Sequence, residues 1–105
     1  MKEKNIIDEI LRERGDNYGS YRSFCKLENE LLDYIINNTN YNSLEPEYKT
    51  TIRMVINKLS RGLNGKIEYL DNWTDIIGYV TLLKNILEED RSKIYLTENN
   101  TDVIL

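Results

Sequence analysis

The chain has 105 residues, a formal net charge of −4, 40% hydrophobic residues and 30% charged residues, which is typical of one ordered domain. The net negative charge argues against a protein that coats nucleic acid, because such binding depends on Lys and Arg side chains that neutralise phosphates. The sequence contains no histidine and a single cysteine, Cys25, so an intramolecular disulfide, the usual zinc sites and histidine-based catalytic triads are excluded.

The N-terminal residues lead into an amphipathic segment and lack the apolar run of a signal peptide. No segment approaches the roughly 20 apolar residues of a membrane span. We therefore expect a cytoplasmic protein that has no membrane partner.

Residues 3–14 predict a short first helix, because four apolar residues form one narrow stripe. These residues are Ile6, Ile7, Ile10 and Leu11. Gly15 follows where a left-handed residue would end the helix, and residues 15–20 have the composition of a turn around Tyr18. Tyr18 either takes part in binding or fills the gap between the first two helices.

Longer apolar stripes predict a second helix over residues 20–37 and a third over residues 46–63. The stripes consist of Phe24, Leu27, Leu31 and Ile35 in the second helix and of Ile52, Val55, Ile56, Leu59 and Leu63 in the third. Pro46 suits a first helical position, where its missing amide proton costs nothing. Another face of the third helix carries Lys58 and Arg61, which are either a solvated pair or part of an anion site.

Residues 71–90 predict a fourth helix, which carries the densest chemistry in the chain. Asp71 is a suitable N-cap, while Asn72, Asp75 and Tyr79 share one face. The expected buried face consists of Ile76, Val80, Leu83 and Leu87. The polar residues either only cap and stabilise this helix or also bind a ligand.

Residues 93–97 and 101–105 resemble two extended segments around a turn, so we predict a C-terminal β-hairpin or extended tail. The predicted fold is mainly α: a compact bundle of three to four helices over residues 1–92, followed by the 93–105 segment. Because the core is small and the tail apolar, we also expect a homo-oligomer.

Three motifs mark the chain: Arg14-Gly15-x-x-Tyr18-Gly19, Lys58-x-x-Arg61 and Asp71-Asn72-Trp73-x-Asp75-Ile76-x-Gly78-Tyr79. Together they resemble a family of small proteins that are encoded mainly by phages and prophages and have no assigned function. The resemblance covers about residues 10–89. It implies a phage protein that acts in the cytoplasm of an infected bacterial cell, and it implies no particular reaction.

A more distant similarity is to the all-helical nucleotide pyrophosphohydrolases of the MazG type, which bind magnesium through paired acids on two helices. Glu30-x-x-Asp33 and Asn72-x-x-Asp75 would take those places. The similarity implies a magnesium-dependent enzyme acting on a nucleoside triphosphate, with Glu30, Asp33 and Asp75 as metal ligands. Since Asn72 replaces an acid, the chemistry that activates water is weakened, and we favour binding over catalysis.

The binding hypothesis is that basic, aromatic and polar side chains form one pocket for a nucleotide, without a cofactor or direct nucleic-acid contact. The candidate residues are Arg14, Tyr18, Arg22, Lys58, Arg61, Asp71, Asn72, Asp75 and Tyr79. Cationic groups would bind phosphate, and tyrosines would stack on a base. In a phage context, such a protein could sequester a nucleotide-derived signal of bacterial immunity. A minor alternative is a protein inhibitor of a host defence nuclease.

Overall fold

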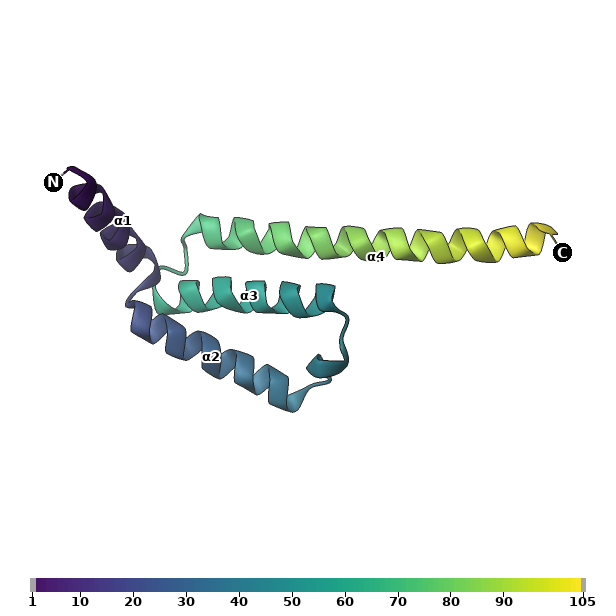
Figure 1. Ribbon diagram of the computed structural model, residues 1–105, viewed down its shortest axis with the longest axis horizontal. Helices are drawn as coiled ribbons and strands as arrows, with labels where there is room; N and C mark the ends of the chain where they lie inside the picture. Colours follow the sequence, from purple (N-terminus) through teal and green to yellow (C-terminus); the bar gives the residue numbers. More distant parts are fainter. Residues whose placement is uncertain (1, 105) are drawn as a thin grey trace.

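The computed structural model describes the backbone of residues 2–104 and the side chains of residues 5–94. Within this range the chain forms α1 (Lys2–Tyr18), α2 (Tyr21–Asn38), a short 3₁₀ helix η1 (Tyr41–Ser43), α3 (Pro46–Asn64) and α4 (Leu70–Ile104) (Figure 1). No strand occurs in the described backbone. The prediction of a mainly helical chain is confirmed.

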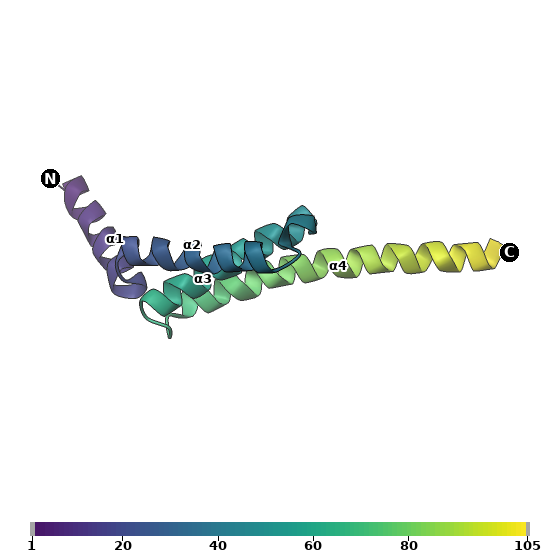
Figure 2. The same cartoon turned by 90° about the horizontal axis from the view of Figure 1, so that it is seen from below.

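Helix α3 lies between α2 and α4 and packs against both, and the C-terminal end of α1 meets α2 and α3 at one end of this assembly (Figure 2). The buried side chains are few. Among the described residues, Phe24 on α2, Tyr41 in η1 and Ile56 on α3 are the buried apolar residues. Ser60, one turn after Ile56, is fully buried and its hydroxyl donates to the Ile56 carbonyl.

The first helix ends later than the sequence predicted. α1 continues through Gly15 to Tyr18, and Gly19, with φ +76°, is the left-handed residue that terminates it. Asn64 at the end of α3 stabilises the helix end at Gly19 rather than at Gly15, because its Nδ2 donates to the carbonyls of Tyr18 and Ser20 at 2.7 and 3.0 Å. The predicted turn at residues 15–20 is therefore reduced to Gly19 and Ser20.

The ends of α1 and α3 are joined by their backbones. The amide of Lys66 donates to the carbonyl of Asn17 at 2.8 Å. A Cβ on Gly65 would lie 2.1 Å from that same Asn17 oxygen, so this position requires glycine. The close approach fixes the angle at which α1 leaves the other helices.

Helix α4 starts at Leu70, so Asp71 lies in its first turn rather than at the N-cap. The predicted hairpin or extended tail at residues 93–105 is not seen, since α4 continues through Ile104, and the predicted boundary after residue 92 falls inside this helix. Ion pairs between residues four apart, Lys84 with Glu88 and Glu89 with Lys93, favour helix up to this boundary. A hairpin without a sheet to join is marginal in water. The side chains of residues 95–105 lie outside the description.

The molecule is elongated rather than compact. Its principal extents are 73 × 34 × 24 Å and its radius of gyration is 19.8 Å, whereas a compact domain of 100 residues has about 13 Å. Part of the predicted buried faces is exposed as a result: Leu63 on α3 and Val80 and Leu87 on α4. In the described part of the chain α4 packs mainly on α3, and residues at the edge of the predicted face lie outside that contact.

Within the described residues, no helix is long and apolar enough to cross a membrane.

Candidate functional site

A pocket of about 380 Å³ lies where the end of α1 meets α2 and α3. Its lining consists of Leu11, Arg14, Gly15, Tyr18, Gly19, Tyr21, Phe24 and Arg61. Aromatic rings and two guanidinium groups dominate this set, and it contains no carboxylate. Its volume falls within the range of small-molecule sites, roughly 300–1,000 Å³.

Arg61 is the half-buried cation of this pocket. Its guanidinium carbon lies 4.8 Å from the ring centroid of Tyr18 and 5.7 Å from that of Phe24. Within the described part of the chain, Arg61 forms no salt bridge, and its N–H groups donate no hydrogen bond. Aromatic faces thus hold the plane of the guanidinium while its donors remain available to an anion.

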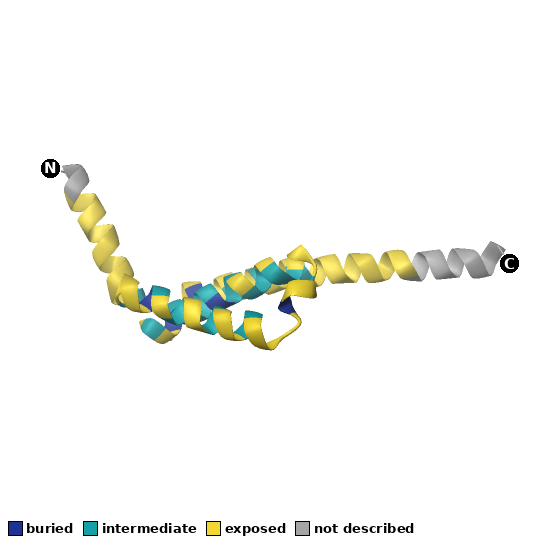
Figure 3. Ribbon diagram, turned by 60° about the horizontal axis from the view of Figure 1, so that its bottom comes forward, coloured by how far each residue is buried: buried dark blue, intermediate teal, exposed yellow. Residues whose placement is uncertain are grey.

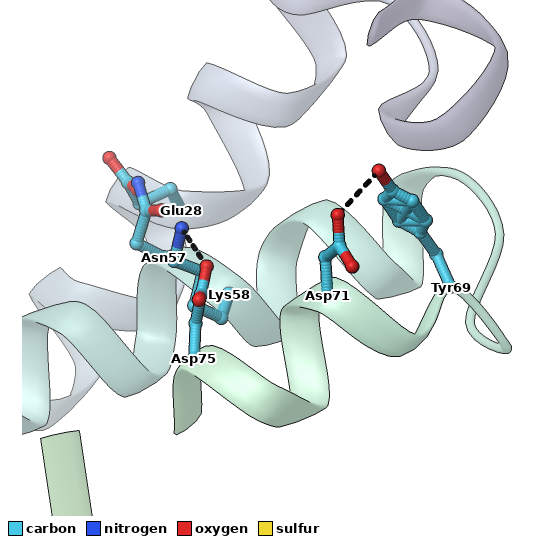
Figure 4. A network of polar contacts seen from close by, with 6 residues as sticks. All are labelled: Glu28, Asn57, Lys58, Tyr69, Asp71 and Asp75. Atoms are coloured by element: carbon cyan, nitrogen blue, oxygen red, sulfur yellow. Dashed lines mark hydrogen bonds and ion pairs between the residues drawn. The ribbon is translucent and has the colours of Figure 1, made fainter. Parts of the chain in front are cut away.

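Tyr18 also contacts a second tyrosine. The rings of Tyr18 and Tyr69 meet edge to face, with centroids 5.8 Å apart and planes inclined by 70°. The Tyr69 hydroxyl donates to Oδ2 of Asp71 at 2.8 Å (Figure 4), and this hydrogen bond raises the pKa of Tyr69 to about 12. Asp71 therefore reaches the pocket only indirectly, by fixing Tyr69 against Tyr18.

The second guanidinium of the pocket belongs to Arg14, an exposed residue of α1 that also lines it. Arg22 was predicted to join these residues, but it is exposed and does not line the pocket. Tyr21, which the sequence did not indicate, takes part instead. Its ring lies 6.2 Å from that of Phe24, and a hydrogen bond with Cys25 raises the pKa of its hydroxyl.

Lys58 and Asp75 lie away from the pocket and pair with each other. The Lys58 Nζ lies 2.9 Å from Oδ2 of Asp75, which joins α3 to α4 (Figure 4). The Lys58 side chain is only 12% exposed and that of Asp75 is 47% exposed. On the other side of α3, Asn57 donates to the carboxylate of Glu28 on α2. These contacts link the three helices, so Lys58 and Asp75 have a structural use that needs no ligand.

Asn72 and Tyr79 were predicted to contact a ligand, and the structure places both between α4 and the rest of the chain. Asn72 is 2% exposed, and its Nδ2 has no hydrogen-bond partner among the described residues. Tyr79 lines a separate groove of about 370 Å³ between α4 and the first turns of α3. Neither lines the pocket at the end of α1.

The acidic residues that the pyrophosphohydrolase alternative assigns as magnesium ligands do not lie close together. Glu30 pairs with Lys26 on its own helix at 4.0 Å, and Asp75 pairs with Lys58. Among the described residues, no three side chains of His, Cys, Asp or Glu are close enough to hold a metal ion together. Glu30, Asp33 and Asp75 therefore form no common site within one chain.

Of the nine candidate residues, Arg14, Tyr18 and Arg61 lie together in the pocket, whereas the other six lie elsewhere. Compared with protein-family models, with curated proteins and with solved structures, the chain shows no match in any of the three. The geometry of the pocket is therefore the basis for a functional proposal.

Proposed function

We propose that the chain binds a small nucleotide-type ligand in the pocket between α1, α2 and α3. The base would stack on the tyrosine rings, and the phosphate would bind Arg61 and Arg14. The observation that carries this proposal is the Arg61 guanidinium, which lies 4.8 Å above the Tyr18 ring at the wall of a pocket without carboxylates.

The chemistry of the lining supports an anionic, planar ligand. A guanidinium that stacks on an aromatic ring keeps its edge free to form paired hydrogen bonds with phosphate oxygens. Tyr18, Tyr21 and Phe24 supply apolar ring surface, and base–aromatic stacking contributes about 1–3 kcal/mol per base. Cations and ring surface in one pocket match the two halves of a nucleotide.

The biological role that we propose is sequestration of a nucleotide-derived signal of bacterial immunity by a phage protein in the infected cell. The phage part rests on the motif resemblance that includes Arg14, Tyr18 and Arg61. Sequestration needs affinity without turnover, and the lining supplies cationic and aromatic contacts with no acid to activate water. Hydrolysis of a nucleoside triphosphate would require acids that the pocket lacks.

The test is a binding panel of AMP, ATP, cyclic AMP, cyclic di-AMP and ADP-ribose, with and without magnesium, followed by thermal shift and calorimetry. Arg14→Gln should weaken the tightest binder about tenfold or more, because a charge-assisted hydrogen bond contributes about 1.5–3 kcal/mol. Arg12→Gln is the matched control. It removes another exposed arginine of α1, one that does not line this pocket.

Two results would count against the proposal. If no member of the panel raises the melting temperature, the pocket is not a nucleotide site. If chromatography finds more product than protein after incubation with magnesium, the chain is an enzyme, and the pyrophosphohydrolase alternative replaces sequestration. Ligand recovered intact after denaturation supports the proposal.

A further inference from the structure

Helix α4 carries a second apolar stripe that its own chain covers only in part. The stripe consists of Trp73, Val80, Leu87 and Ile94, which recur every seven residues and are 41%, 46%, 39% and 60% exposed. Ile77, beside them, is 67% exposed. A seam by which one helix packs along another has two apolar positions in each heptad. The four residues fill one of them, and Leu70 and Ile77 fill the other in the first two heptads.

The packing of α4 on α3 uses a different face. Asp75 pairs with Lys58 of α3, and Tyr79, Leu83 and Ile86 line a groove with the first turns of α3. The apolar stripe lies to one side of these residues, and in Figure 3 the described part of α4 beyond the other helices is exposed throughout. Trp73, at the start of the stripe, contacts its own chain, because its Nε1 donates to the Ile67 carbonyl at 2.7 Å. Intramolecular packing therefore leaves the stripe partly exposed, most of all at Ile94.

Helix α4 also extends well past its partner. The first turn of α3, at Pro46 and Glu47, lies beside Leu83 and Ile86, and α4 then continues alone to Ile104 (Figure 1). At 1.5 Å per residue, the part from Leu87 onward is about 27 Å long. A single helix of this length is marginal in water unless an apolar face packs on another element.

The chain exposes more surface than a compact monomer of its mass. The accessible surface is 8495 Å², whereas a compact monomer of this mass exposes about 6,200 Å². The excess of about 2,300 Å² matches what each subunit buries in a large obligate homodimer, roughly 1,000–2,500 Å². The elongated chain therefore leaves enough surface exposed to form an interface of that size.

We infer that the stripe on α4 packs against the same stripe of a second copy of this chain, in a two-fold symmetric dimer. A heptad seam is self-complementary, because any copy presents the same apolar face to the other. In the last two heptads Lys84 and Arg91 occupy the second seam position, and Lys84 pairs with Glu88 of its own helix, so the seam is apolar mainly in its first half and carries both signs of charge in its second half. The dimer goes beyond the proposed nucleotide site, which lies on α1, α2 and α3.

The experiment measures the molar mass of the full chain by sedimentation equilibrium from about 1 to 200 μM. We expect a dimer for the wild-type chain, and a rise of at least 100-fold in the dimer dissociation constant for Val80→Glu and Leu87→Glu. The matched control is Leu82→Glu. Leu82 is 63% exposed at the edge of the groove between α4 and α3 and points about 160° away from Val80, given 3.6 residues per turn.

Circular dichroism provides a second readout. In the two seam variants, α4 beyond α3 should lose helix at concentrations where the wild-type chain keeps it, since its packing partner is gone. The inference is overturned if the wild-type chain is a monomer over the whole range, if the seam variants stay dimeric, or if Leu82→Glu dissociates the dimer as strongly as they do. Nucleotide binding by a monomeric variant would leave the proposed function intact.

Discussion

The guanidinium carbon of Arg61 lies 4.8 Å from the centroid of the Tyr18 ring. This contact joins α3 to the last residue of α1, and Tyr18 is in turn held by Tyr69 and, through it, by Asp71. The pocket thus depends on a series of contacts in which one carboxylate, two tyrosines and one arginine fix each other. Each link in this series predicts the effect of a substitution.

Arg61→Lys tests the stacking link. Lysine keeps the charge but lacks the planar guanidinium, so the stacked ring contact is weakened and the paired hydrogen bonds to phosphate are lost. We expect the dissociation constant for the tightest nucleotide of the panel to rise about tenfold, with a loss of about 0.5–1 kcal/mol in stability from the cation–π contact. Calorimetry and urea denaturation measure the two effects. Equal affinity of Arg61→Lys and the wild-type chain would exclude Arg61 from the site.

The hydrogen bond from Tyr69 to Asp71 predicts a pH dependence in the alkaline range. It raises the pKa of Tyr69 to about 12 in the folded chain, whereas a tyrosine in the unfolded chain has a pKa of about 10. Because the folded pKa is the higher one, this contribution to stability is fully present below pH 10 and is lost as the pH rises toward 12.

Tyrosinate absorbance during alkaline titration is the measurement. The wild-type chain should contain a component that titrates near pH 12 and is missing in Tyr69→Phe. Tyr34→Phe is the control, because Tyr34 is 71% exposed and its hydroxyl makes no hydrogen bond in the described part of the chain. If the absorbance component near pH 12 persists in Tyr69→Phe, it belongs to another tyrosine.

Two glycines four residues apart should respond in opposite directions to alanine. Gly19 has a φ of +76°, and a Cβ there would lie 2.1 Å from the Asn64 carbonyl oxygen, so Gly19→Ala should cost about 2 kcal/mol or more. Gly15 lies within α1 and has nothing within 4 Å of an added Cβ. Gly15→Ala should therefore stabilise the chain by about 0.5–1 kcal/mol. Urea denaturation of both variants checks the sign, and a similar change in the two would contradict the assigned helix end.

The same pair of glycines shows what the sequence could predict. The apolar stripes of α2 and α3 and the capping residue Ser20, whose hydroxyl accepts from the Ser23 amide at 3.1 Å, define these helices locally. The end of α1 is not defined by local sequence, since Gly15 and Gly19 are both suitable as the left-handed residue that ends the helix. The side-chain amide of Asn64 stabilises the end at Gly19. A contact between residues 18 and 64 is not a local feature of the sequence.

The candidate site depends on where α1 ends. Because α1 continues to Tyr18, the tyrosine lies at a helix end beside α2, and Tyr21 joins the pocket although it stands outside the apolar stripe of its helix. The sequence grouped Asn72 and Asp75 with the arginines because both are polar and belong to one motif. Asp75 instead pairs with Lys58 of α3, and the Asn72 side chain is buried away from the pocket.

Asn72→Leu tests this structural assignment directly. The Asn72 side chain is 2% exposed and its Nδ2 lacks a hydrogen-bond partner among the described residues. A buried polar group without a partner costs about 1–3 kcal/mol, so an apolar side chain of similar shape should be neutral or stabilise the chain by about 1 kcal/mol. Nucleotide affinity should not change, because Asn72 does not line the pocket.

Asn64→Leu is the matched comparison, since it changes the same kind of side chain at a position where the amide is used. Its Nδ2 donates to the carbonyls of Tyr18 and Ser20 at 2.7 and 3.0 Å. Removal of this donor should destabilise the chain by about 1–3 kcal/mol and weaken nucleotide binding, because Tyr18 loses its fixed position under Arg61. Thermal denaturation and calorimetry of the two variants give the answer. A loss of nucleotide affinity in Asn72→Leu at unchanged stability would show that Asn72 takes part in nucleotide binding and would contradict the pocket assignment.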